Sequence, residues 1–264
     1  MTARMPAGGE DSAQAHYSRL AASYDQNWAY SRAYIAWMTR CILDRAAIGP
    51  GQVVADIGCG TGLYSRQLAA EGATVICADP SQAMLDQLPA DPAMLPVRAS
   101  AQDIAERRVR LPAQRLDAIV IKEAVHHIPA SDRQVVLNGL AELLAPGGRI
   151  VIAMLPAQIS YPLFTAALQR FESLQPDPAD IVAVLSDAGL ETELSYDSYT
   201  LTFEKDQYLS MVRDRYMSLL ADFTDAELEH GITEIQESHP DDRMEFADRF
   251  AFIRGIRAQA SVSC

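Results

Sequence analysis

Short apolar runs alternate with amphipathic stretches through the middle of this 264-residue chain. The apolar runs, several of them β-branched, predict strands near residues 52–57, 73–78, 96–100, 116–121 and 149–155. Apolar residues at helical spacing predict helices near 62–71, 81–88 and 132–145. Strands that alternate with helices at this period are parallel and joined by helical crossovers, so the pattern predicts a doubly wound α/β sheet.

The two flanks of the chain follow a different pattern. Residues 11–48 have helical spacing up to Gly49-Pro50-Gly51, which predicts a tail and helical cap over 1–48 and a main domain over 49–264. Beyond residue 155 we expect a helix near 177–188, a loose strand near 192–203, two helices within 204–238 and a last strand at 250–256. Residues 204–248 are therefore predicted to be a helical insertion before the last strand.

One predicted strand runs directly into a glycine-rich turn. The run Val53-Val54-Ala55-Asp56-Ile57 ends in glycines at alternate positions, Gly58, Gly60 and Gly62. A strand, a glycine turn and a helix let a ligand approach bare backbone beside a helix N-terminus. A dinucleotide fingerprint would need glycine in place of Leu63, and a P-loop would need a lysine after the glycines. Both of these ligand classes are therefore disfavoured.

Asp79 ends the next predicted strand, 17 residues beyond Gly62. A carboxylate at this place in an α/β sheet can accept both hydroxyls of a ribose. The pair of features predicts an adenosine-type site without provision for a pyrophosphate.

Three segments in this order resemble the class I S-adenosylmethionine-dependent methyltransferases, in the small-molecule branch that includes ubiquinone and menaquinone biosynthesis enzymes. They are Asp56–Gly62, Ala78–Leu85 and Leu143–Ile152. The resemblance covers roughly residues 45–155. It implies a Rossmann-like, mostly parallel seven-stranded sheet, S-adenosyl-L-methionine as the cofactor, and the insertion at 204–248 as a lid over a small-molecule acceptor.

The resemblance also implies which residues hold the cofactor. Gly58 and Gly60 would face its methionine part, Asp56 would position the amino group, and Asp79 would bind the ribose. The adenine would meet Met84 or Pro80-Ser81 on one side, with the hydroxyl of Ser100 and the backbone of Ala101 and Gln102 as its hydrogen-bond partners. Ser100 stands where relatives often have an aspartate, which makes adenine recognition the least well specified part of the site.

The segment after the fourth predicted strand, Lys122-Glu123-Ala124-Val125-His126-His127, would face both cofactor and acceptor. A histidine with an ordinary pKa of about 6.5 can remove a proton from an acceptor at neutral pH. His126 and His127 are both candidates for this base, and the alternative is that one packs against the loop while the other lines the cofactor. We expect Lys122 to contribute through its backbone or an ion pair with Glu123.

Near the N-terminus, Tyr17 and Tyr24-Asp25 resemble the Tyr-Asp pair that often caps the cofactor in this branch, although packing within a helix is an alternative for Tyr17.

The net charge of −13 narrows the class of acceptor. Residues 204–248 hold 13 Asp and Glu but 4 Lys and Arg, a balance that repels phosphate backbones and disfavours nucleic acid as a partner. No apolar run reaches the ~20 residues of a membrane helix, and the start of the chain lacks a signal-peptide core, so we expect no membrane association. The four cysteines have neither disulfide nor metal-ligand spacing, which favours reduced thiols in the cytoplasm and no metal site. The oligomeric state stays open, with a homodimer among the options.

Methyl transfer to a small molecule, in secondary metabolism for example, is the function that this pattern favours. Three alternatives remain open at this point: a cyclisation or other non-methylating reaction on the same fold, a tRNA or protein methyltransferase, and a regulatory protein that binds the nucleoside without catalysis. The element that becomes methylated, oxygen, nitrogen, carbon or sulfur, is not specified by the sequence.

Overall fold

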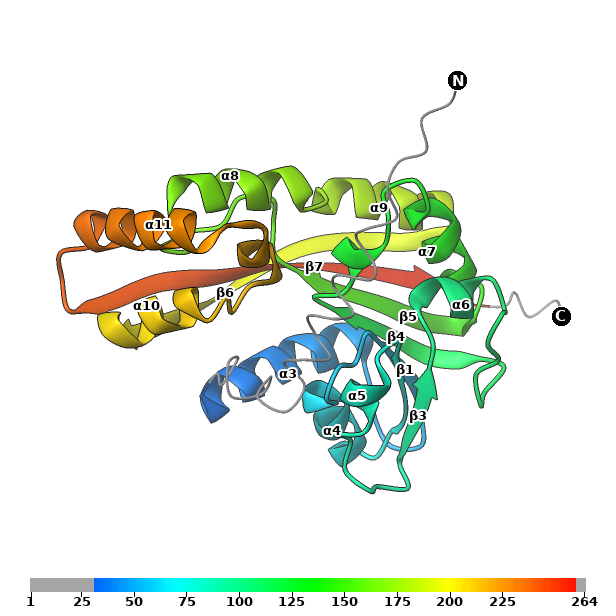
Figure 1. The fold of residues 1–264 in the computed structure, drawn as a ribbon. Coiled ribbons are helices and arrows are strands. Elements are labelled where there is room, and N and C mark those ends of the chain that lie inside the picture. Colours follow the sequence, from blue (N-terminus) through cyan, green and yellow to red (C-terminus); the bar gives the residue numbers. More distant parts are fainter. Residues whose placement is uncertain (1–30, 260–264) are drawn as a thin grey trace, which may run out of the picture.

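A computed structural model describes residues 31–259 and contains one seven-stranded sheet with helices on both faces (Figure 1). The strand order is β3-β2-β1-β4-β5-β7-β6. The strands are β1 (Val53–Ile57), β2 (Thr74–Asp79), β3 (Met94–Arg98), β4 (Leu116–Lys122), β5 (Leu144–Met154), β6 (Leu190–Glu204) and β7 (Arg243–Arg257). The predicted doubly wound, mostly parallel sheet is confirmed.

The first five strands are parallel, and their order reverses between β1 and β4. Ligands of such sheets bind beyond the carboxyl ends of the strands at this reversal. Asp56 near the end of β1, Asp79 at the end of β2 and Lys122 at the end of β4 all lie along that edge. The topology therefore places three of the sequence-predicted residues at one edge of the sheet.

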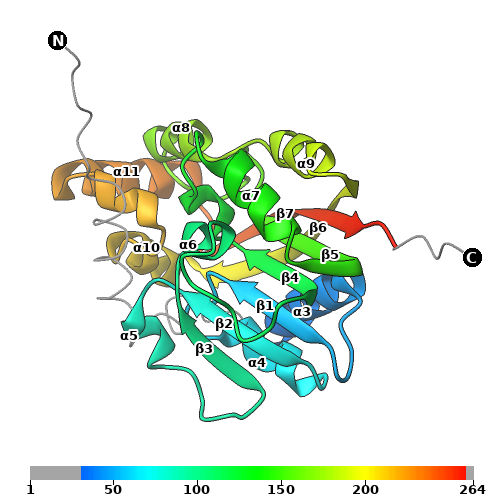
Figure 2. The same cartoon turned by 90° about the vertical axis from the view of Figure 1, so that its right-hand side faces the viewer.

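Helices cover the two faces of the sheet in separate groups (Figure 2). On one face α3 (Arg32–Ala46) and α4 (Leu63–Ala70) pack their buried side chains against Val54, Val75 and Val120. On the other face α6 (Ala101–Ala105), α7 (Arg133–Ala141) and α9 (Pro178–Asp187) pack against Ala55, Ile76 and Ile119. Alternate residues of the same strands supply the two cores, because side chains of a strand point to opposite faces in turn. Within residues 31–259, no helix combines the length and apolar character that crossing a bilayer would require.

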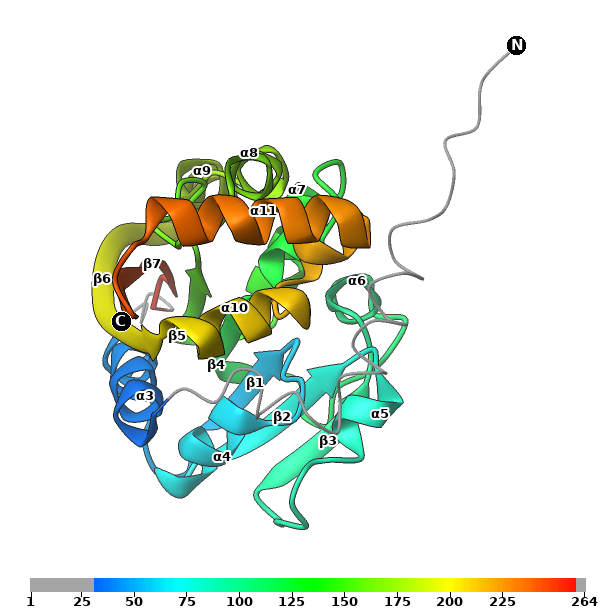
Figure 3. The same cartoon turned by 60° about the vertical axis from the view of Figure 1, so that its left-hand side comes forward.

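The last two strands form a long antiparallel hairpin that extends beyond the parallel part of the sheet (Figure 1). Between them lie α10 (Lys205–Arg213), the 3₁₀ helix η2 (Ser218–Asp222) and α11 (Asp225–Ser238). Figure 3 shows α10 and α11 at the side of the sheet where the parallel strands end. The helical insertion expected at 204–248 is shorter than predicted, because residues 243–248 are the first part of β7.

Other boundaries also differ from the expectation. The helix expected at 132–145 ends at Ala141, and β5 begins at Leu144. The third strand ends at Arg98, so that Ser100 is the cap of a helix rather than part of a strand. The sequence pattern also missed α8 (Thr165–Leu174), whose buried residues are Ala167 and Phe171. The remaining short elements are α5 (Gln82–Leu85) and the 3₁₀ helix η1 (Val125–His127).

Candidate active site

The glycine turn after β1 is tied to the neighbouring strand by its backbone. The amide of Gly58 donates to the carbonyl oxygen of Ala78 at 2.8 Å, and the amide of Gly60 donates to Oδ2 of Asp79 at 3.0 Å. Gly58 has a φ of +75°, and a Cβ added there would lie 2.5 Å from the Cβ of Ala124. Glycine at 58 is therefore required both by the backbone conformation and by the close approach of the chain after β4.

Asp79 joins the glycine turn to the loop after β2. Its Oδ1 accepts from the amide of Ser81 at 2.8 Å, while Oδ2 accepts from the amide of Gly60. Burial raises the pKa of this carboxyl, and the two amide hydrogen bonds act in the opposite direction. A carboxylate has about four acceptor positions, so capacity remains for hydroxyl groups of a ligand.

Asp56 lies on the face of the sheet that α4 covers. Its Oδ2 accepts from the hydroxyl of Ser65 at 2.5 Å. Burial raises the pKa of Asp56 to about 6, and the hydrogen bond from Ser65 opposes that rise. This carboxylate is buried within the protein at the base of the glycine turn, next to the place predicted for an amino group.

The segment predicted to meet an adenine forms the start of α6. The hydroxyl of Ser100 accepts from the amide of Asp103 at 3.1 Å, and the amide of Ser100 donates to Oδ2 of Asp103 at 3.0 Å, which completes a capping box. The hydroxyl of Ser100 also donates to Oδ2 of Asp103 at 2.6 Å. Gln102 donates to Oδ2 of Asp132 at 2.7 Å, and Ala101 is half-buried beside it. The Ser100 hydroxyl has given its only proton to the cap, so that it offers a ligand no more than an acceptor lone pair.

The loop after β2 carries the other two residues predicted to meet the adenine. Pro80 is exposed at the end of that strand, as a surface residue beside a ligand would be. Met84 is buried in α5, with 2 % of its surface accessible. The structure thus keeps Met84 within the packing of this loop.

The chain leaves β4 through a conformation that is uncommon for residues other than glycine. Glu123 has a φ of +53°, and its Oε1 accepts from the amide of Leu155 at 2.8 Å. Burial raises the pKa of Glu123, and the charge of Lys122 opposes that rise. Backbone strain of this kind clusters at functional sites, and here it turns the segment 124–127 toward the glycine loop.

Lys122 directs its ammonium group into the face covered by α4. Its Nζ lies 5.3 Å from the ring centroid of Tyr64 and 5.5 Å from that of Phe250. Burial lowers the pKa of Lys122, while Glu123, Asp248 and Asp56 act in the opposite direction. Among the described residues Lys122 forms no ion pair with Glu123, and its ammonium instead lies over these two aromatic rings.

His126 and His127 lie side by side in η1, with ring centroids 4.1 Å apart. Burial lowers the pKa of His126 to about 4, helped by the charges of Arg133 and Lys122. Desolvation also lowers the pKa of His127 to about 3, and the charge of His126 acts in the same direction. Unlike His126, His127 is exposed at the surface. The Nδ1 atom of His126 is buried without a hydrogen-bond partner among the described residues. Both imidazoles are neutral at pH 7, but such low pKa values make them weak bases.

A buried carboxylate that sequence reasoning missed lies near Lys122. Asp248 is fully buried on β7, where Oδ2 accepts from the hydroxyl of Tyr34 at 2.8 Å and Oδ1 accepts from the hydroxyl of Tyr161 at 2.7 Å. Burial raises the pKa of Asp248 to about 6, opposed by the two tyrosine hydrogen bonds and by Lys122. The signal in the sequence was a single polar residue in the alternating apolar series Met244, Phe246, Asp248, Phe250, and it was hidden because these residues were assigned to helix.

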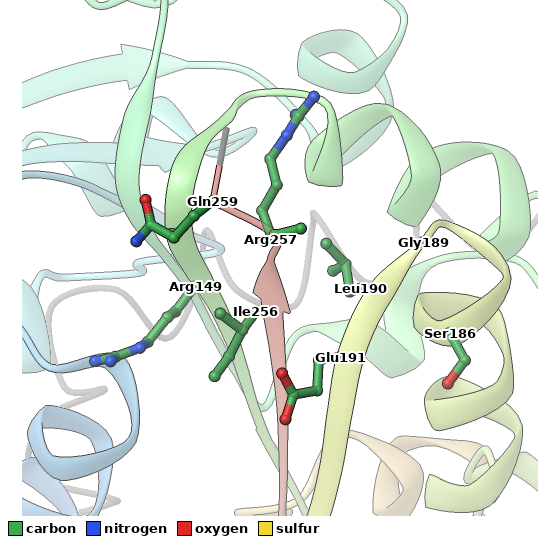
Figure 4. A pocket seen from close by; sticks show the side chains of 10 residues that line it. Arg149, Ser186, Gly189, Leu190, Glu191, Ile256, Arg257 and Gln259 are labelled. Atoms are coloured by element: carbon green, nitrogen blue, oxygen red, sulfur yellow. The ribbon is translucent and has the colours of Figure 1, made fainter. Parts of the chain in front are cut away.

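Tyr17 and Tyr24 lie outside the described residues. Figure 4 shows a surface pocket of about 540 Å³ around Arg149, Glu191 and Arg257. It is formed where β6 begins and β7 ends, at the opposite end of the sheet from the glycine turn, and therefore belongs to a different region of the molecule.

Comparison with known proteins agrees with this geometry. Residues 54–148 match the family described as a methyltransferase domain. The ubiquinone biosynthesis O-methyltransferase of Coxiella burnetii is 33 % identical over 117 residues, which are 44 % of this chain and 48 % of that protein. The chain thus spans about half the length of this curated relative.

Solved structures share the fold at lower identity. A putative methyltransferase from an antibiotic biosynthesis pathway of Anabaena variabilis superposes with a TM-score of 0.65 at 18 % identity, over 83 % of this chain and 96 % of that one. Phosphoethanolamine N-methyltransferase 2 of Haemonchus contortus, in complex with S-adenosyl-L-methionine, superposes with a TM-score of 0.54 at 19 % identity, over 84 % of this chain and 52 % of that one. Residues 54–148 are therefore similar in sequence to a methyltransferase domain, and the described residues share the fold of these solved structures.

Proposed function

We propose that this protein transfers a methyl group from S-adenosyl-L-methionine to a small-molecule acceptor. The observation that carries the proposal is the junction of the glycine turn with Asp79, in which Oδ2 of Asp79 holds the amide of Gly60 at 3.0 Å. This contact places a carboxylate with free acceptor positions directly beside backbone without side chains. The carboxylate can bind the ribose of the cofactor, and the backbone can face its methionine part.

The residues present fit this cofactor. Gly58 and Gly60 are partly accessible, so the turn presents peptide groups that no side chain of these residues covers. Asp56 at the base of the turn would face the amino group, and Asp79 would bind the ribose. Pro80 and the first residues of α6, Ala101 and Gln102, would border the adenine.

The cofactor supplies an electrophilic methyl group on a sulfonium, and the protein must align the acceptor, exclude water and accept a proton where the nucleophile carries one. For the exclusion of water we propose the helices between β6 and β7 as the lid. In this insertion the hydroxyls of Tyr208 and Tyr216 are 3.0 Å apart and buried.

The acceptor that we propose is small, uncharged or weakly polar, and not a nucleic acid. The acidic residues of 204–248 would repel a phosphate backbone, and the O-methyltransferase relative favours an oxygen nucleophile. The described cysteines Cys41, Cys59 and Cys77 are free, and we place the reaction in the reducing environment of the cytoplasm.

Calorimetric titration with S-adenosylhomocysteine tests the proposal. Asp79→Ala should weaken binding at least fivefold, about 1 kcal/mol, because hydrogen bonds to the ribose are lost. Asp86→Ala is the matched control, since Asp86 is exposed on the same loop and its Oδ1 bonds to Gln82. Unchanged affinity in Asp79→Ala, or equal loss in both variants, contradicts the placement of the ribose.

A transfer assay separates the proposal from a non-methylating reaction. Protein incubated with radiolabelled S-adenosyl-L-methionine and a panel of hydroxylated aromatic compounds should release S-adenosylhomocysteine in step with a labelled product. Conversion of an acceptor without release of S-adenosylhomocysteine would favour a cyclase or a related activity.

A further inference from the structure

Lys122 and Asp248 belong to one polar cluster. It lies between the carboxyl ends of the parallel strands, where we place the cofactor, and the β6–β7 hairpin. Phe250, whose ring lies 5.5 Å from Nζ of Lys122, is two residues from Asp248 on the same face of β7. Asp248 raises the pKa of Lys122 in turn, which places the two charges within electrostatic range of each other. Tyr34 and Tyr161 hold the carboxylate from α3 and from the loop after β5.

The cluster contains polar groups that the protein itself leaves unsatisfied. The ammonium of Lys122 forms no hydrogen bond or ion pair with any residue of 31–259, although the side chain is only partly accessible. The hydroxyl of Tyr64, beneath that ammonium, is buried and also lacks a partner within the described chain. Buried polar groups without a hydrogen-bond partner lower the stability of the folded state. Beside the proposed cofactor site, they indicate that a ligand supplies the missing partner.

We propose that Lys122 and Asp248 hold the hydroxyl group of an uncharged, hydroxylated ring as the methyl acceptor, and that Asp248 takes its proton; this rests on the methyl transfer proposed above. In the transfer, a bond forms between the acceptor oxygen and the methyl carbon while the bond from that carbon to the sulfonium breaks. The electron pair of the broken bond stays on sulfur, which becomes a neutral thioether. The hydroxyl proton passes to the carboxylate of Asp248, and the ammonium of Lys122 stabilises the negative charge that develops on the oxygen.

The balance of charge around Lys122 selects an uncharged acceptor. The charges of three carboxylates, Glu123, Asp248 and Asp56, raise the pKa of Lys122 against the effect of its burial. This excess of negative charge repels a carboxylate or phosphate on the acceptor. A cationic amine has no lone pair with which to accept a hydrogen bond from the ammonium of Lys122. A hydroxyl can bind both charged groups, since it can donate a hydrogen bond to Asp248 and accept one from Lys122.

The side chains beside Asp248 are aromatic. Phe246 and Phe250 flank Asp248 along β7, and the ring of Tyr161 lies 5.0 Å from that of Phe246. Aromatic side chains favour contact with other rings at such separations. Each oxygen of Asp248 accepts one tyrosine hydroxyl, so positions remain for a third donor.

Three probes of equal size and different charge test the proposal: catechol, benzoate and benzylamine. Their binding to the full chain saturated with S-adenosylhomocysteine is measured by ligand-observed NMR, which needs no turnover. Catechol should bind at least tenfold more tightly than the other two. Tighter binding of benzoate or of benzylamine, or no binding of catechol to the unmodified protein, overturns the proposal.

Two variants and one control assign the effect to the cluster. Asp248→Asn and Lys122→Met should each weaken catechol binding about tenfold, because a hydrogen bond to a charged group is lost. Glu245→Gln, on the exposed face of the same strand, should leave it unchanged. Catechol affinity unaffected by both Asp248→Asn and Lys122→Met overturns the proposal.

The unmodified protein supplies a test that does not depend on the folding of a variant. Its catechol affinity should fall as the pH is lowered through about 6, the pKa of Asp248, because the carboxylate then becomes protonated. The charged or titratable groups that face Asp248 are Lys122 and Glu123 from the end of β4, Tyr64 from α4, Tyr34 from α3 and Tyr161. An affinity that stays constant from pH 8 to 5 contradicts the role of Asp248.

S-adenosylhomocysteine affinity, recorded in the same samples, separates the two proposals. If the nucleoside fails to bind, the proposed function fails. If it binds and catechol recognition ignores Asp248 and Lys122, only the acceptor site is wrong.

Discussion

Replacement of Asp248 by asparagine should make the protein more stable at neutral pH. Asp248 is fully buried, and its pKa rises from an ordinary 3.8 to about 6 because burial disfavours the charged form. At pH 7.5 the difference between these two values corresponds to about 3 kcal/mol spent on keeping the side chain ionised in the folded state. Asparagine has the shape of the protonated acid and removes this cost.

The hydrogen bonds reduce the expected gain only in part. The amide oxygen of the substituted asparagine can accept from one tyrosine hydroxyl, and its NH₂ can donate to the oxygen of the other. Charged acceptors form stronger hydrogen bonds than neutral ones, so we expect a net gain in the free energy of unfolding of about 1 to 3 kcal/mol at pH 7.5.

The gain must depend on pH with a definite sign. Folding raises the pKa of Asp248, so the folded state favours the protonated carboxyl. This contribution to the free energy of unfolding is fully present below about pH 3.8 and is lost as the pH rises through about 6. The advantage of Asp248→Asn should therefore shrink by about 2 kcal/mol between pH 7.5 and pH 4.5.

Urea denaturation followed by tryptophan fluorescence measures the stability of both proteins at each pH. The ring centroid of Trp37 lies 5.5 Å from that of Tyr34, which is one of the partners of Asp248. Glu245→Gln serves as the control and should show no difference that varies with pH. An Asp248→Asn protein that is less stable than the unmodified chain at pH 7.5, or a gain that is equal at both pH values, would refute the reasoning.

Three other changes test separate parts of the site. Gly58→Ala should destabilise the protein by about 1 to 3 kcal/mol more than Gly60→Ala in urea unfolding. Both glycines have positive φ, but of the two only at 58 does the new Cβ lie within 4 Å of another residue of 31–259; equal losses would show that the close approach to the chain after β4 is unimportant. Ser100→Ala should lower the unfolding free energy by about 1 kcal/mol through loss of the helix cap, and an unchanged melting temperature would argue against the capping box. In a methyl transfer assay, His127→Gln should not change the fall in kcat/KM that we expect below about pH 6, because that fall reports Asp248 and the pKa of His127 is lowered to about 3; disappearance of the fall would identify His127 as the base.

The parallel half of the fold was predictable because its signals are local. The run from Val53 to Ile57 ends in glycines, and the run from Thr74 ends in Asp79, so sequence alone placed both strands and the edge where they end. The hydrogen bond from Gly60 to Asp79 is visible only in the structure, although it agrees with that placement, since adjacent parallel strands bring their carboxyl ends together.

The hairpin and its buried carboxylate were not predictable in the same way. The residues from Arg243 to Asp248 lie beside acidic helical segments, and their period of two was too short to stand out. The partners of Asp248 are also remote in sequence, with Tyr34 separated from it by 214 residues. Local patterns give no information about a contact of that kind, and only the assembled sheet brings the two together.

The pairing of Glu204 with Arg243 closes the base of the hairpin. Everything between these residues leaves the sheet and returns to it at a single point. Helices of another length or shape could therefore be exchanged there as a cassette while the strand register and the groups on β4 and β7 stay in place. Such modularity offers a route by which a lineage of these proteins can change the size of the molecule it accepts while preserving its chemistry.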